Sequence, residues 1–191
     1  MNTLNAIKSR RTTRKFKQTQ LSHNDIYDLI DAARVAPTGA NLQSLKYMIV
    51  ADKDVREKMF PHIKYAGYIP DWNPTFEECP PVFIVVLNDT SIKPTDKCEV
   101  DCGSAIMSMC LAATEKGIGS CWLGAISRPE LKAVLNLDDK YDIPYLLGLG
   151  YPDQDAKEVE MTDSIKYYFD DNGTVCVPKR SMEEILISDF K

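Results

Sequence analysis

The chain has 191 residues, of which 44% are hydrophobic and 27% charged, and its formal net charge is −5. This composition is ordinary for a globular protein, and the length fits one domain that buries roughly 70% of its unfolded surface without disulfides. The longest wholly apolar run, Val82–Leu87, is too short to span a bilayer, and the N-terminal segment has no signal-peptide core. We therefore expect no membrane association and a cytoplasmic location.

The charge is distributed unevenly along the chain. Residues 1–24 contain six basic residues and no acidic one, whereas the other 17 basic and 28 acidic residues give the remainder a charge of −11. A body this acidic argues against nucleic acid as a partner, because phosphate neutralisation needs a broad positive surface. The basic segment can still serve a single anion.

Six cysteines are expected to be reduced, buried thiols, because a chain of this size builds its own core. The sequence has no C-x-x-C pair, and its two histidines lie far from the cysteines, so no metal site is expected. The six are Cys79, Cys98, Cys102, Cys110, Cys121 and Cys176.

The first half of the chain predicts helices at 4–9 and 24–33, a strand at 46–51 and a helix at 53–60. Ser22 and Asp25 have the spacing of a capping box at the start of the second helix. Residues 61–81 then contain five prolines together with Tyr65, Tyr68 and Trp72. This aromatic content predicts a functional loop, although a lid that only covers the core explains the same residues.

The second half begins with a continuously apolar strand at 82–88. The helix predicted at 100–116 is small or apolar around most of its circumference, so we expect it to be buried in a core or in a subunit interface. Strands follow at 120–123 and 145–149, separated by a helix that Ser127 caps and Pro129 opens. Few strands interleaved with helices indicate an α+β fold, in one domain over residues 1–191.

Residues 165–191 form a C-terminal extension in this prediction. Asn172 and Gly173 favour a hairpin with a two-residue turn, and Ser181 with Glu184 opens a short last helix. The chain has no G-x-G-x-x-G and no P-loop motif, so neither type of nucleotide site is supported.

Three segments carry groups suited to a ligand. Arg10, Arg11, Thr12 and Arg14 offer planar donors and a hydroxyl that match phosphate oxygens, although a solvated basic face is the alternative. The turn-rich loop 36–43 offers the amides of Asn41 and Gln43. Glycines in the segment 117–124 allow backbone N–H groups to approach a ligand, or simply end a helix before a buried strand.

Taken in this order, the segments resemble the FMN-dependent nitroreductase family. The resemblance is carried by IKSRRTTRKF, ARVAPTGANLQ, EKGIGSCWLGAI and LLGLGYPDQ, and it covers about residues 3–154. It implies a central, mainly antiparallel sheet flanked by helices, a long helix in the interface of an intertwined homodimer, and FMN as cofactor.

The resemblance also implies roles for individual residues. The phosphate and ribityl chain would be held by Arg10, Arg11, Thr12 and Arg14. The partner subunit would contribute Pro37, Thr38, Asn41 and Gln43, and the backbone around Trp122, Leu123 and Gly124 would face the flavin ring. Tyr65, Tyr68 and Trp72 are candidates to stack on the acceptor, and no catalytic side chain is named because the flavin carries the redox chemistry.

Two positions depart from the family pattern. Members often have Pro-Trp where this chain has Ser44-Leu45, so the packing there differs. Many members also complete the phosphate site with a basic pair, for which this chain offers only Lys157.

The function implied by the resemblance is a two-step hydride transfer through flavin N5. NAD(P)H would be the donor, and a small electron-poor molecule such as a nitroaromatic or a quinone would be the acceptor. The alternatives are a non-catalytic flavin-binding or redox-sensing module and a specialised deiodinase-like or flavin-fragmenting enzyme. A weak nucleic-acid binder would need phosphate contacts beyond the basic segment.

Overall fold

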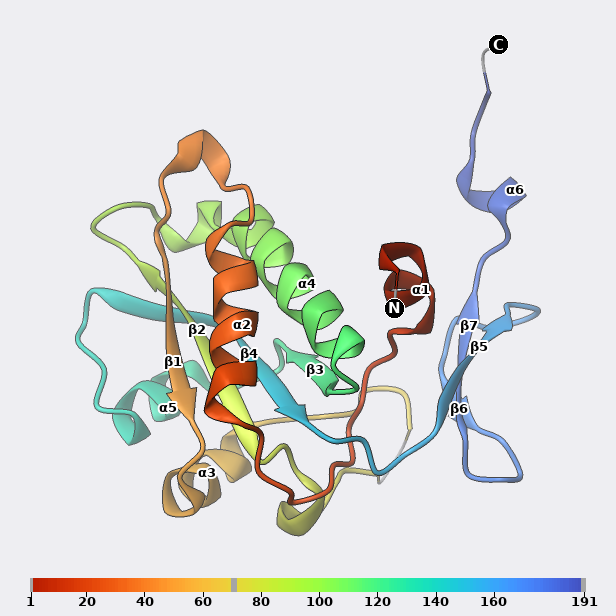
Figure 1. Ribbon diagram of the computed structural model, residues 1–191, viewed down its shortest axis with the longest axis horizontal. Helices are drawn as coiled ribbons and strands as arrows, with labels where there is room; N and C mark the ends of the chain where they lie inside the picture. The colour runs from red at the N-terminus through yellow and green to blue at the C-terminus, as the bar shows by residue number, and fades with distance from the viewer. Residues whose placement is uncertain (1, 70–71, 190–191) are drawn as a thin grey trace.

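The computed structural model describes residues 2–69 and 72–189. Its centre is an antiparallel four-stranded sheet in the order β1-β2-β4-β3 (Figure 1). The strands are β1 (Leu45–Val50), β2 (Val82–Asp89), β3 (Gly119–Leu123) and β4 (Tyr141–Gly150). Strands and helices therefore combine in the predicted α+β arrangement.

Helices cover both faces of this sheet. One face packs against α2 (His23–Arg34) and α4 (Glu99–Glu115), and the other against α3 (Lys53–Met59) and α5 (Arg128–Val134). Alternate residues of β2 enter the two cores: Ile84 lies in the first, and Phe83 and Val85 lie in the second. Burial on both faces explains why this strand is continuously apolar although the sheet is antiparallel.

Local signals placed most helix starts correctly. The Ser22 hydroxyl accepts a hydrogen bond from the Asp25 N–H at 3.0 Å, as the capping box predicts. Ser127 occupies the N-cap position of α5 and Pro129 lies in its first turn, as predicted. The Ser127 side chain makes no capping hydrogen bond, however, and the proline lacks one of the N–H donors that a cap would satisfy.

Strand β4 is longer than its predicted range of 145–149. Its first residues, Tyr141 and Asp142, pair with the end of β2, and the register shifts between Val86 and Asn88. Pro144 lies in the irregular stretch, where a residue without an N–H is tolerated. The strand therefore continues through a proline at which a pattern-based prediction stops.

The C-terminal extension contains a second sheet, in the order β5-β7-β6. Its strands are β5 (Ala156–Glu160), β6 (Tyr168–Phe169) and β7 (Val175–Lys179), and the parallel pairing of β5 with β7 was not predicted. Figure 1 shows this sheet beside the main body, with α6 (Met182–Ile185) beyond it. Positions 190–191 of the extension and 70–71 of the predicted loop lie outside the described residues.

The predicted hairpin exists, but its turn is different. The N–H of Asp170 donates to the Thr174 carbonyl, which leaves three residues in the loop instead of two. Gly173 is left-handed with φ of 76°, whereas Asn172 is not, so the turn has the form of a three-residue loop with one glycine. The following helix does begin at the predicted capping box of Ser181 and Glu184.

All six cysteines are free and buried, as expected. Burial raises the pKa of the Cys121 thiol to about 12, so this thiol stays protonated and inert near neutral pH. Within the described residues no group of three potential metal ligands occurs, and no helix combines the length and apolar character needed to cross a membrane.

Candidate functional site

The arginine cluster Arg10–Arg14 follows α1 (Thr3–Ser9) and lies along the edge of β3. Thr12 forms a parallel bridge with Ser120, and the N–H of Thr13 donates to the Ser120 carbonyl at 2.9 Å. This edge is free in the main sheet because β3 is its last strand. The cluster is therefore held by backbone pairing, and its side chains remain available for other contacts.

Gln154 fixes the same segment from the other side. Its carbonyl oxygen accepts from the backbone N–H groups of Arg14 and Lys15 at 2.8 and 3.0 Å, and its amide donates to the Thr12 carbonyl at 3.3 Å. One side chain thus satisfies three backbone groups of the cluster. This glutamine is the last residue of the motif LLGLGYPDQ, but nothing in the sequence indicated its role.

Gly119 permits the close approach of the two segments. A Cβ added there would lie 2.6 Å from the Thr13 hydroxyl, a distance that two non-bonded atoms cannot adopt. Gly117 is left-handed with φ of 70° and lies just past the end of α4, where a glycine commonly ends a helix. The missing side chain of Gly119 therefore lets the arginine cluster pack against β3, and the two glycines leave space beside it.

A cavity of about 320 Å³ lies at this junction. It is lined by Arg10, Arg11, the segment 117–120 and Gln154, among others. Arg11 donates to the Arg10 carbonyl and to Glu158, each at 2.5 Å, while its buried Nε has no hydrogen-bond partner in the described part of the chain. A buried guanidinium N–H without an acceptor is costly, and an anionic oxygen is the ligand that would satisfy it.

The predicted phosphate ligand Arg14 is engaged elsewhere, and so is Lys157, whose part in the phosphate site the sequence left open. The Nε of Arg14 donates to the Tyr65 carbonyl at 2.7 Å, and its guanidinium lies over the Tyr167 ring at 4.4 Å. Lys157 pairs with Asp170 at 2.7 Å, and this contact raises the pKa of the lysine. In this structure Arg10 and Arg11 are therefore the arginines that line the cavity.

The predicted loop of Pro37, Thr38, Asn41 and Gln43 lies at the opposite end of α4. The N–H of Gly39 donates to the carboxylate of Asp101, in the first turn of α4, at 2.8 Å. The cavity of the arginine cluster contains Thr114, near the other end of the same helix. A 17-residue helix is about 25 Å long, so one chain does not bring the two predicted groups together.

This loop has an unusual backbone. Ala40, Asn41 and Gln43 are left-handed, with φ of 51°, 55° and 52°. Each such residue other than glycine costs about 1–2 kcal/mol, with asparagine the best tolerated. A conformation of this kind persists only where surrounding contacts impose it, and such segments cluster at ligand sites.

Asp101 is buried at 2% exposure, and its second oxygen accepts from the Lys93 ammonium at 2.5 Å. Burial by itself would raise the pKa of Asp101, but the hydrogen bonds from Lys93 and the Gly39 N–H hold it below its ordinary value. The carboxylate is therefore charged at neutral pH. The sequence carried no signal for the contact between Asp101 and Gly39, because these residues are 62 positions apart and meet only through the packing of α4 against the loop.

The predicted flavin-facing segment lies on β3. Trp122 is 39% exposed, and its ring meets Tyr145 edge-on at 5.3 Å. The Leu123 side chain is in the core, so only its backbone can face a ligand. Gly124 is exposed directly after the strand.

The predicted acceptor residues are not equivalent. The Tyr65 side chain is 5% exposed and packs near Phe60, so it belongs to the core in this structure and offers no open stacking face. Tyr68 is 47% exposed with its ring 5.2 Å from Tyr167, and Trp72 meets Phe169 edge-on at 5.5 Å. The hydroxyl of Tyr167 also accepts from the Gly67 N–H at 2.8 Å, so the C-terminal extension holds this loop.

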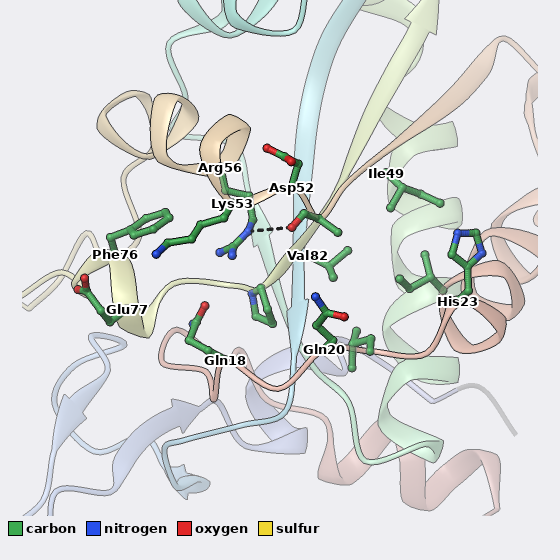
Figure 2. Close-up of a pocket in the computed structure, with 14 residues that line it drawn as sticks. Gln18, Gln20, His23, Ile49, Asp52, Lys53, Arg56, Phe76, Glu77 and Val82 are labelled. Atoms are coloured by element: carbon green, nitrogen blue, oxygen red, sulfur yellow. Dashed lines mark hydrogen bonds between the residues drawn. The ribbon is translucent and has the colours of Figure 1, made fainter.

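A larger cavity, of about 610 Å³, lies between the start of α2, α3 and the segment 76–82 (Figure 2). It is lined by none of the predicted cofactor residues. Its buried Arg56 donates to the carbonyls of Ala51, as drawn in Figure 2, and Pro80, and it lies 5.4 Å from the Phe76 ring. These contacts give the arginine a structural role that joins α3 to the start of β2.

Comparison with known proteins places the chain in a family. Residues 7–151 match the Nitroreductase family. A protein of Archaeoglobus fulgidus with the provisional name NADH dehydrogenase/NAD(P)H nitroreductase is 30% identical over 166 residues, which cover 84% of this chain and 91% of that protein. The iodotyrosine deiodinase of Thermotoga neapolitana is 24% identical, with coverage of 84% and 94%.

Solved structures share the fold. The FMN-dependent nitroreductase of Clostridium difficile R20291 matches with a TM-score of 0.67 at 23% identity, covering 84% of this chain and 92% of that one. The family match extends from the end of α1 to the end of β4 and includes the arginine cluster, the left-handed loop and β3. The chain therefore belongs to the nitroreductase family.

Proposed function

We propose that the protein is an FMN-dependent oxidoreductase that takes hydride from NAD(P)H and passes electrons to a small electron-poor acceptor such as a nitroaromatic or a quinone. The observation that carries the proposal is Arg11, which lines a cavity together with Arg10 and whose buried Nε has no hydrogen-bond partner among the described residues. The donor set suits a phosphate monoester, because guanidinium groups match its oxygens in charge and geometry.

The residues present fit FMN in other respects. Gly117 and Gly119 let the backbone approach a ligand closely beside the cavity, and β3 continues from there to the exposed Trp122 and Gly124. When bound, FMN supplies the hydride chemistry. The chain would hold the phosphate through Arg10 and Arg11, with Thr12 nearby, and would support the ring through backbone groups at 122–124.

We further propose that the site is completed by a second copy of the chain. The loop with Pro37, Thr38, Asn41 and Gln43 lies beyond one end of α4, and the arginine cluster lies near the other (Figure 1). A twofold axis across α4 would bring the loop of one protomer to the arginine cluster of its partner, at two equivalent sites.

The surface around α4 supports such an interface. Val100 and Met107 of this helix are 83% and 41% exposed, and Leu4 and Ile7 of α1 are 67% and 49% exposed. Apolar groups gathered on one face of a protein mark an association surface. The C-terminal segment adds Ile185, Leu186 and Ile187, all exposed, while β1 ends the main sheet, so an intertwined dimer has both a protruding segment and an open strand edge to use.

The purified protein tests the proposal directly. We expect a yellow protein of dimeric mass whose flavin absorbance is bleached by NADH or NADPH without oxygen and restored by a nitroaromatic or a quinone. A colourless protein that does not bind added FMN would refute the proposal.

Two other outcomes lead to different functions. The similarity to the iodotyrosine deiodinase of Thermotoga neapolitana extends over most of this chain, so a dehalogenating enzyme is one alternative. Its assay is the release of iodide from iodotyrosine by the reduced protein. A yellow protein whose reduced form no acceptor reoxidises would favour a flavin-binding sensor.

A further inference from the structure

We propose that Asp101, paired with Lys93, is a positioning residue that holds the loop 37–43 in the shape in which it contacts the flavin. The inference rests on the proposed function, because it concerns the half of the site that one protomer would offer to its partner. Asp101 itself lines neither of the two cavities described above, and it acts through the Gly39 backbone.

The loop holds only part of its own shape. Its internal backbone bonds are those of one short turn, from the Asn41 N–H to the Thr38 carbonyl at 3.0 Å and from the Leu42 N–H to the Gly39 carbonyl at 3.2 Å. Three of its residues are left-handed, and the bonds that involve its side chains are long, at 3.4 Å from the Gln43 N–H to the Thr38 hydroxyl and 3.3 Å from the Gln43 amide to the Asn41 carbonyl. Asn41 and Gln43 are also exposed, so core packing does not fix them. A strained, exposed segment needs a restraint from outside itself.

Asp101 supplies that restraint. One carboxylate oxygen accepts from the Gly39 N–H at 2.8 Å and the other from the Lys93 ammonium at 2.5 Å. The Lys93 carbonyl in turn accepts from the Asn88 amide at 2.8 Å, which connects the pair to β2. Because the acceptor is charged and buried, its bond to the loop is shorter and stronger than one between neutral groups.

The space at the contact agrees with this role. A Cβ on Gly39 would lie 3.1 Å from the Lys93 ammonium nitrogen and 3.6 Å from the Asp101 oxygen. Glycine is therefore the residue that brings the loop backbone onto the ion pair without displacing it. The restraint acts between Thr38 and Asn41, two residues predicted to contact the flavin.

The test is FMN affinity in the full-length protein, measured by flavin fluorescence together with the melting temperature of the FMN-free protein. In Asp101→Asn, the one remaining acceptor oxygen can accept from Lys93 or from the Gly39 N–H, but not from both. The asparagine amide N–H group then faces the other donor. We expect the Kd for FMN to rise about tenfold, the scale of one charge-assisted hydrogen bond.

Two further variants separate positioning from simple stability. Asp96→Asn removes a carboxylate that is 73% exposed in the same chain segment, and it should leave the Kd unchanged. In the double variant Lys93→Gln with Asp101→Asn, the glutamine carbonyl can accept from the asparagine amide while the asparagine oxygen accepts from Gly39. We expect this variant to recover most of the FMN affinity.

The possible results are distinct. An Asp101→Asn protein that binds FMN as tightly as the wild type overturns the inference. A weakened affinity that the double variant does not restore, with a lower melting temperature in both, shows a structural role and also overturns it. Failure of the wild-type protein to bind FMN instead refutes the proposed function, and the inference falls with it.

Discussion

Glu158 pairs with Arg11 beside the proposed phosphate site, and its charge opposes an incoming phosphate. It pairs with Arg11 at 2.5 Å, and the side chains of the arginine and the glutamate are 14% and 54% exposed. The substitution Glu158→Gln keeps the shape of the side chain but removes the charge. We predict that this variant binds FMN more tightly than the wild type.

The size of the effect follows from two contributions. A partly exposed ion pair is worth about 0–1 kcal/mol, which the wild-type protein gives up when Arg11 turns to the phosphate. Repulsion between the carboxylate and each phosphate charge is about 1 kcal/mol at about 4 Å in water. For a phosphate with about two charges, these together suggest a gain of about 2–3 kcal/mol, or about 30- to 150-fold in Kd, that shrinks as salt is added.

The assay is a titration of the FMN-free protein with FMN and, separately, with riboflavin, which lacks the phosphate. The gain should appear for FMN alone. Glu160→Gln is the matched control, because Glu160 is exposed two residues further along β5 and loses the same charge. Equal gains for riboflavin, an equal effect in the control, or no gain at all would each contradict the assignment of the phosphate to Arg11.

Three further predictions concern stability and the arginine cluster. Gly148→Ala should lower the free energy of unfolding by about 1–3 kcal/mol in a urea titration, because the new Cβ would lie 2.4 Å from Pro80 in a packed core, whereas Gly67→Ala meets no atom within 4 Å and should not. Gln154→Ala should speed tryptic cleavage after Arg14 and Lys15 while leaving the core intact, and an unchanged rate would show that backbone pairing alone holds the segment. The Lys15 hydrogen bond lowers the pKa of Glu78 from 4.5, so its stabilisation is complete above about pH 4.5 and is lost as the pH falls through the folded pKa. The melting temperature of the wild type should therefore fall more between pH 5 and pH 3 than that of Glu78→Gln.

Local chemistry in the sequence was enough for most of the secondary structure. The N-cap at Ser22 and the capping box at Ser181 start helices as predicted, and the apolar run at 82–88 forms the strand buried on both faces. These signals work because caps and short apolar runs depend on neighbours within a few residues. Errors arose where a distant partner decided the outcome, as at Pro144, which β2 accommodates in a register shift.

The sequence by itself also determined which residue types could hold a phosphate: three arginines within five positions on an otherwise acidic chain. Only the tertiary structure decided which partner each of these side chains takes. It turns Arg14 to Tyr65 and Tyr167, leaves the Nε of Arg11 buried with no acceptor in the part of the chain that the structure describes, and directs Lys157 to Asp170. The physical reason is that a charged side chain bonds acceptors that are close in space, and these can be distant in sequence: the acceptor of Arg14 lies 51 residues away, and Glu158, one of the two acceptors of Arg11, lies 147 residues away.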